Sequence, residues 1–139
     1  MYESLTAFIP GLETGKYGKW SEQTGDGTPK NPYVFCHIEY EEPVENLIQA
    51  LLDIGRNKNM RYVRHIAETS GISSITEPLK EKEIAALDGE TIVSLFLYII
   101  SLTRFDDSLF LDFCECGNAL CLLNRLKEID ETENNQETS

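Results

Sequence analysis

Acidic side chains are the residues of this sequence whose type and spacing could do the most specific chemistry. The chain has 24 Asp and Glu residues against 12 Lys and Arg, a formal net charge of −12 at pH 7. Acids spaced along a rigid helical surface can imitate a phosphate array and attract a basic partner, whereas simple solubility is the alternative explanation of the charge. Acidic residues are concentrated at 39–45 and at 106–115. The residues predicted to bind a partner are Glu39, Glu41, Glu42, Glu45, Asp106, Asp107, Asp112 and Glu115.

Cysteines and histidines could instead hold a metal or provide a nucleophile. Structural zinc sites use paired C-x-x-C knuckles, whereas the only close pair here is C-x-C at 114–116 on a predicted helix, which puts the two thiols on different faces. No sequence signature supports a catalytic thiol, and neither an EF-hand loop nor a complete phosphate-binding loop is present. We therefore predict no catalytic residue, no metal and no cofactor. The residues considered are Cys36, Cys114, Cys116, Cys121, His37 and His65.

One basic patch stands out in this acidic chain. Arg56, Lys58, Arg61 and Arg64 are four of the twelve basic residues and lie within nine positions. Arg61, Arg64 and His65 would share a helix face and could hold a phosphate or a carboxylate. We favour the simpler interpretation, in which the patch is an outer face that pairs with the protein's own acids.

Helical periodicity accounts for most of the chain and would position these groups. Residues 43–55 and 59–71 each carry apolar side chains at helical spacing. Residues 92–102 are apolar on nearly every side, so we predict that their helix is central and buried, with Asp88 as its N-cap. The side chains predicted to face inward on the first two helices are Val44, Leu47, Ile48, Leu51, Leu52, Tyr62, Val63 and Ile66.

The remaining segments complete an all-α prediction of about six helices. Residues 3–13 form a helix that Pro10 kinks or delays, and residues 108–116 and 118–130 form two helices near the C-terminal end. Part of the connection 72–87 is also helical. We expect one compact domain over 1–130 and an acidic flexible tail over 131–139.

A dense run of turn-forming residues interrupts this helical pattern near the N-terminal end. Residues 18–29 read GKWSEQTGDGTP, in which Gly-Asp-Gly and Pro forbid regular structure and predict a long irregular loop. Residues 32–40 alternate briefly and leave room for one short strand or hairpin. We expect Trp20 to anchor the loop by packing it on the helices.

Charge and hydropathy indicate the cellular compartment and exclude some classes of binding partner. No apolar run approaches the roughly 20 residues that cross a bilayer, and the first residues lack the basic segment of a signal peptide. Four sparse cysteines give no disulfide framework, so we expect a cytoplasmic protein with reduced thiols. The negative charge argues against direct binding to nucleic acid or to an anionic membrane.

Three segments together resemble an uncharacterised family of small bacterial and phage-associated proteins. They are KYGKW, DGTPKNP, and the run ISLTRFDDSLFLDFCECG that leads into LLNRLKEID. The family pattern is YGxW, DGTP, RFxD and LKEID, and the match spans most of the chain. This sequence departs from it at Thr103, where an acid is common, and at Asp106, where a cysteine is common, and these departures would alter a shared pocket.

The resemblance implies no activity, because none is known for the family. It does indicate which positions recur among the family's members. They suggest a possible ligand pocket in which the loop meets the end of the apolar helix, formed by Trp20, Asp26, Arg104, Phe105 and Asp107. The other recurring positions are Gly27, Thr28 and Pro29. Arg104 would suit the last carbonyls of its helix and could pair with Asp107.

Two functions of different classes remain open from the sequence. The first is a non-enzymatic acidic interaction protein, and in a sharper form a phage or mobile-element inhibitor that blocks the nucleic-acid site of a basic protein, as anti-CRISPR proteins do. The alternative is a helical ligand-binding protein or enzyme that uses the pocket at Trp20, Asp26, Arg104 and Asp107. The sequence leaves the oligomeric state open.

Overall fold

Helix α6 (Gly89–Leu102) runs through the centre of the protein in the computed structural model, which describes residues 2–21, 24–33, 37–72 and 76–137. Asp88 caps the helix, because its carboxylate accepts a hydrogen bond from the Thr91 backbone N–H at 2.8 Å. Hydrogen bonds from Thr91 lower the pKa of Asp88. Residues 92–97 and Ile99 are buried, so the predicted cap and central position are both confirmed. Within the described residues, neither α6 nor another helix has the length and apolar character needed to cross a membrane.

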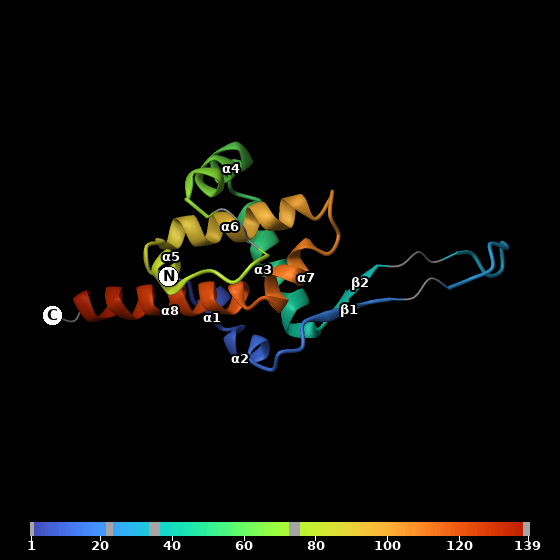
Figure 1. The fold of residues 1–139 in the computed structure, drawn as a ribbon, viewed down its shortest axis with the longest axis horizontal. Helices are drawn as coiled ribbons and strands as arrows, with labels where there is room; N and C mark the ends of the chain where they lie inside the picture. The colour runs from blue at the N-terminus through green and yellow to red at the C-terminus, as the bar shows by residue number, and fades with distance from the viewer. Residues whose placement is uncertain (1, 22–23, 34–36, 73–75, 138–139) are drawn as a thin grey trace.

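The other helices surround α6, with α4 on one side of it and α8 on the other (Figure 1). The structure confirms the predicted fold class, one compact and mostly helical domain with a single small two-stranded hairpin in the described residues. Pro10 lies in the first turn of the second short helix, where its missing N–H is tolerated. The remaining helices are α1 (Glu3–Thr6), α2 (Ile9–Leu12), α3 (Glu42–Gly55), α4 (Met60–Thr69), α5 (Glu81–Ala85), α7 (Leu109–Glu115) and α8 (Asn118–Glu137).

Three phenylalanines form the centre of the core between α6 and α7. The ring of Phe96 meets the ring of Phe113 edge to face, with centroids 5.3 Å apart. Phe110 lies 6.0 Å from Phe113 and also contacts Tyr40. Such aromatic pairs add to the stabilisation that comes from burying the rings.

The N-terminal segment is joined to α8 by a hydrogen bond. The Tyr2 backbone N–H donates a hydrogen bond of 2.8 Å to Oδ2 of the buried Asp130. Helix α8 continues beyond this contact to Glu137, into the stretch that we predicted to be a flexible tail. The division into a domain of 1–130 and a tail of 131–139 stays a prediction.

Two side chains predicted to face inward are instead exposed. Tyr62 is 56% exposed and Leu52 is 40% exposed. On α4 the buried stripe consists of Val63 and Ala67, which lie four residues apart and therefore share a helix face that Tyr62 does not. On α3 the buried stripe is Val44, Leu47 and Leu51.

A hairpin arm, described at residues 17–21, 24–33 and 37–40, leaves the helical body next to α3 (Figure 1). Its antiparallel strands β1 (Gly18–Trp20) and β2 (Ile38–Tyr40) pair Gly18 with Tyr40 and Trp20 with Ile38. The described part of its outer end is a turn in which Asp26 accepts hydrogen bonds from the backbone N–H and the hydroxyl of Thr28, at 3.0 and 2.8 Å. These bonds lower the pKa of Asp26.

The arm corrects the prediction that the loop packs on the helices with Trp20 as its anchor. Trp20 is 50% exposed, and Figure 1 shows the arm projecting away from the helical body. Trp20 is held in the arm by its pairing with Ile38 of the other strand. The contact with the body is made at the base, where Tyr17 and Tyr40 pack against the core.

Candidate functional site

Tyr40 lies where the base of the arm meets α7. Its ring packs edge-on against Phe110, with centroids 6.2 Å apart and planes at 77°. Burial raises the pKa of Tyr40 to about 12, and Cys114, Asp107 and Asp112 contribute further to the shift. Because the two acidic groups of the sequence flank this tyrosine, the fold brings parts of both together.

Three aspartates around the start of α7 form an acidic corner, defined here as Asp106, Asp107 and Asp112. The Ser108 hydroxyl lies 2.9 Å from Asp106 Oδ1 and 3.3 Å from Asp112 Oδ2. A hydroxyl has one proton, so it can donate to only one of the two carboxylates at a time. The corner therefore concentrates negative charge, although no acidic or thiol cluster in the described residues is arranged to hold a metal ion.

The other predicted acids lie at several places around the base of the arm. The Glu41 backbone N–H donates to the Tyr17 carbonyl at 2.8 Å, which places Glu41 beside β1. Burial raises the pKa of Tyr17, and Glu115 is among the smaller contributors. Glu39 Oε1 is 3.8 Å from His37 Nε2 within the arm. Glu45 is exposed in the first turn of α3.

Glu42 lies in the first turn of α3, where this helix meets α2. It lines a shallow pocket with Phe8, Gly11 and Pro43, where α2 packs on the start of α3. Helix N-termini favour acidic residues, so its position is explained by the start of α3. A surface for a partner is therefore best centred on the acidic corner and Glu41.

The residues of the predicted ligand pocket do not converge. Asp26 lies in the turn at the outer end of the arm, whereas Arg104 follows the end of α6. Phe105 is 83% exposed. No ion pair joins Arg104 to Asp107 in the described part of the chain. The described residues of the arm therefore form no common pocket with Arg104.

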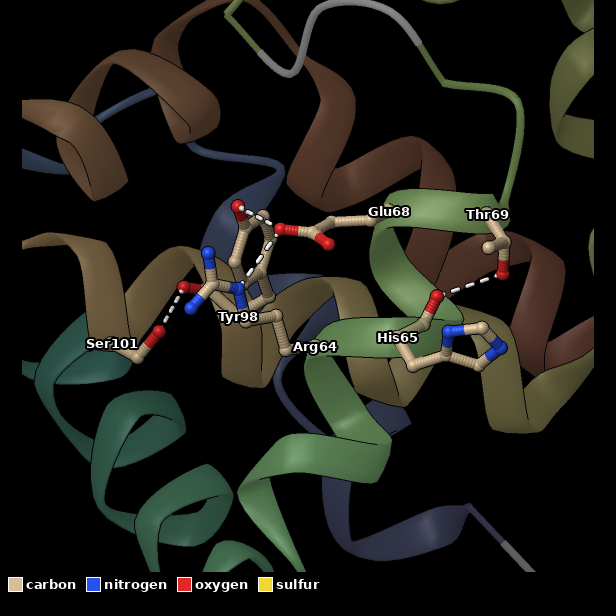
Figure 2. A network of polar contacts seen from close by, with 6 residues as sticks. All are labelled: Arg64, His65, Glu68, Thr69, Tyr98 and Ser101. Carbon is tan, nitrogen blue, oxygen red and sulfur yellow. Dashed lines mark hydrogen bonds and ion pairs between the residues drawn. The ribbon is translucent and has the colours of Figure 1, made fainter.

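Two of the four residues of the basic patch, Arg56 and Arg64, pair with neighbouring acids, in agreement with the simpler interpretation. Arg64 Nε lies 2.9 Å from Glu68 Oε1, and the same oxygen accepts a hydrogen bond from the Tyr98 hydroxyl at 3.4 Å. Figure 2 shows this contact linking α4 to α6. Arg56 NH1 lies 3.1 Å from Asp53 Oδ1. Exposed pairs of this kind add little to stability, because solvent and salt screen them.

The three described thiols differ in burial, although all three contribute to the raised pKa of Tyr17. Cys114 is buried and burial raises its pKa to about 12, whereas Cys121 is exposed. Cys116 is partly exposed, so the C-x-C pair is divided between two environments as predicted. Cys36 lies outside the described residues.

Sequence reasoning missed two features that could contact a ligand or a partner. Tyr33, near the outer end of the arm, is 54% exposed. A groove of about 540 Å³ also opens between α3, the start of α4 and the end of α6. Leu52, which belonged to the predicted inner face of its helix, lines this groove instead of the core.

Comparison with known proteins identifies a family whose function is unknown. A family model described as "Family of unknown function (DUF6508)" matches residues 2–132, which include the arm, the acidic corner and the groove. No curated protein and no solved structure matches the chain. The functional conclusion therefore rests on the geometry and charge of this chain.

Proposed function

The chain belongs to the DUF6508 family of unknown function, and we propose that it is a non-enzymatic interaction module that binds a basic protein. The observation that carries the proposal is the projecting arm with an acidic corner at its base. The arm offers exposed aromatic side chains, and the corner offers concentrated negative charge. Together they match a partner surface that combines Lys or Arg side chains with an apolar pocket.

The arm has the composition of a binding element. Trp20 and Tyr33 are about half exposed, and Trp and Tyr are among the residues that most often dominate binding energy at protein interfaces. A two-stranded hairpin without its own core is marginally stable in water, so contact with a partner would stabilise it. Its strand edges could also pair with a strand of the partner.

The acidic corner supplies electrostatic complementarity. Asp106 and Asp112 converge on one hydroxyl, and Asp107 and Asp112 both contribute to the raised pKa of Tyr40. A Lys or Arg of the partner would relieve the repulsion among these carboxylates. Charge of this kind steers association and makes the association rate sensitive to salt.

The narrower form of the proposal is an inhibitor from a phage or another mobile element in the bacterial cytoplasm. Its target would be a basic protein that handles nucleic acid, and the acids would occupy the nucleic-acid site, as in anti-CRISPR proteins. The net charge of −12 supports this form, because it disfavours binding to nucleic acid directly.

Charge reversal at the corner tests the proposal. We expect the double variant Asp107→Lys with Glu41→Lys to recover at least about tenfold less basic partner from a bacterial lysate than the unchanged protein, because attraction becomes repulsion. Both side chains are exposed, so the fold should be retained. The measurement is quantitative mass spectrometry of the salt eluate from the immobilised protein.

The matched control reverses the same number of charges elsewhere. Glu131 and Glu133 are exposed on α8, away from the arm (Figure 1). The variant Glu131→Lys with Glu133→Lys should recover the partner at the unchanged level. Equal loss in both variants would mean that overall charge alone drives the association, and no loss in either would exclude the acidic corner.

A further inference from the structure

The groove between α3, α4 and α6 combines an apolar floor with two arginines. It is lined by the last turns of α3 and α6 and by the first residue of α4. Its volume of about 540 Å³ lies within the range of about 300–1,000 Å³ that is typical of small-molecule sites. The lining residues are Leu52, Gly55, Arg56, Met60, Leu97, Ile100, Ser101, Thr103 and Arg104.

The floor is apolar and accessible because α3 has a glycine where it crosses α6. A Cβ at Gly55 would lie 3.3 Å from Leu97 Cδ2, so a larger residue there would crowd the floor. Leu52 and Met60 are 40% and 42% exposed at its sides. An apolar ligand body would remove these side chains from water, which is favourable.

The two arginines give the groove a positive rim in an otherwise acidic protein. Arg104 makes no ion pair or hydrogen bond with its side chain in the described part of the chain, although acidic residues outnumber basic ones two to one. Arg56 pairs with Asp53 at 3.1 Å, but both side chains are mostly exposed. Such a pair is weak enough for a bound anion to replace the Asp53 carboxylate.

Helix capping does not account for these arginines. At the end of α6 the Ile100 carbonyl accepts a hydrogen bond of 2.6 Å from the Thr103 hydroxyl, and the Leu102 carbonyl accepts from two backbone N–H groups. At the end of α3 the Leu52 carbonyl accepts from the Arg56 backbone N–H. The Arg104 guanidinium is therefore left for another acceptor, and Arg56 has its exposed pair with Asp53.

We propose that this groove binds a small amphipathic anion, with one carboxylate held by Arg56 and Arg104 and an aliphatic or aromatic body against Leu52, Met60 and Leu97. Arginine forms paired hydrogen bonds to a carboxylate, which fixes the head group. The volume of about 540 Å³ is that of a small-molecule site. This site is separate from the arm and the acidic corner, and it stands independently of the function proposed above.

A matched pair of fluorescent probes tests the site. 8-Anilinonaphthalene-1-sulfonate carries an aromatic body and one anionic group, and N-phenyl-1-naphthylamine has the same body without the charge. We expect the anionic probe to bind the unchanged protein at least about tenfold more tightly than the neutral probe, because charge-assisted hydrogen bonds add to apolar contact. Octanoate should displace it, whereas octan-1-ol should not.

Substitution of the arginines assigns the binding to the groove. Arg56→Gln and Arg104→Gln should each weaken binding of the anionic probe by about tenfold, and the neutral probe should be unaffected. Arg61→Gln is the matched control, since Arg61 is exposed on α4 and does not line the groove. Circular dichroism would verify that all three variants are folded. Equal affinity for the two probes, or equal affinity in the Arg104→Gln and Arg61→Gln variants, would overturn the proposal.

Discussion

Replacing Phe96 by alanine is expected to lower the free energy of unfolding by about 3–5 kcal/mol. The ring is fully buried on α6 and meets Phe113 edge to face at 5.3 Å, so its loss leaves a cavity and removes an aromatic pair. A domain of this size is stable by about 5–15 kcal/mol, so the variant would lose a large share of its stability. Urea denaturation followed by circular dichroism measures the change.

Phe105→Ala is the matched control for this prediction. It removes the same side chain from a position that is 83% exposed, so the expected change is within about 0.5 kcal/mol. If the two variants lost the same stability, the assignment of α6 as the central helix would be wrong.

Raising the pH from 9 toward 12 is expected to destabilise the protein, and Cys114 should be a principal cause. Burial holds the pKa of Cys114 at about 12, against an ordinary value of 9.0. Above pH 9 the unfolded chain releases this proton while the folded chain keeps it, so the stability present below pH 9 is lost as the pH rises. At pH 11 the loss from this thiol is about 2–3 kcal/mol.

Substitution isolates that contribution from the other groups that titrate at high pH. The variant Cys114→Ala should lose less stability between pH 8 and pH 11 than the unchanged protein, by the amount given above. Cys121→Ala removes an exposed thiol and should follow the unchanged protein. Urea unfolding at the two pH values provides the data, and parallel losses in all three proteins would show that Cys114 is not shielded by burial.

The local pattern of apolar and capping residues was sufficient to predict most of the helical body. The apolar run at 92–102 predicted a central helix, and Asp88 has a side chain suited to an N-cap. The two helices predicted at 108–116 and 118–130 correspond to α7 and α8, which are separated at Gly117, whose φ is 92°. These features depend on residues close together in the sequence, which is why periodicity identifies them.

The arm and the groove depend on contacts between distant segments. Glycines and prolines at 25–32 predicted a turn, but only the pairing of Trp20 with Ile38 converts the flanking residues into a projecting hairpin. A tryptophan favours a buried site on average, and that preference gave the wrong expectation for Trp20. Leu52 has the spacing of a core residue, yet α6 and α4 leave that part of α3 open.

The acidic corner was predicted in part. Sequence clustering identified Asp106, Asp107 and Asp112 as neighbours, because they lie within a helical turn or two. It did not predict that Tyr40 would bring the base of the arm against them.

The central claim is that the arm and its acidic base bind a protein while the helical body supports them. The most direct measurement compares partner recovery by the unchanged protein and by a variant in which residues 21–37 are replaced by Asn-Gly. Trp20 and Ile38 are paired across the strands, so this two-residue turn can close the hairpin. The account predicts that the variant keeps the unfolding free energy of the body and loses the partner; full recovery of the same partner by the folded variant would contradict it.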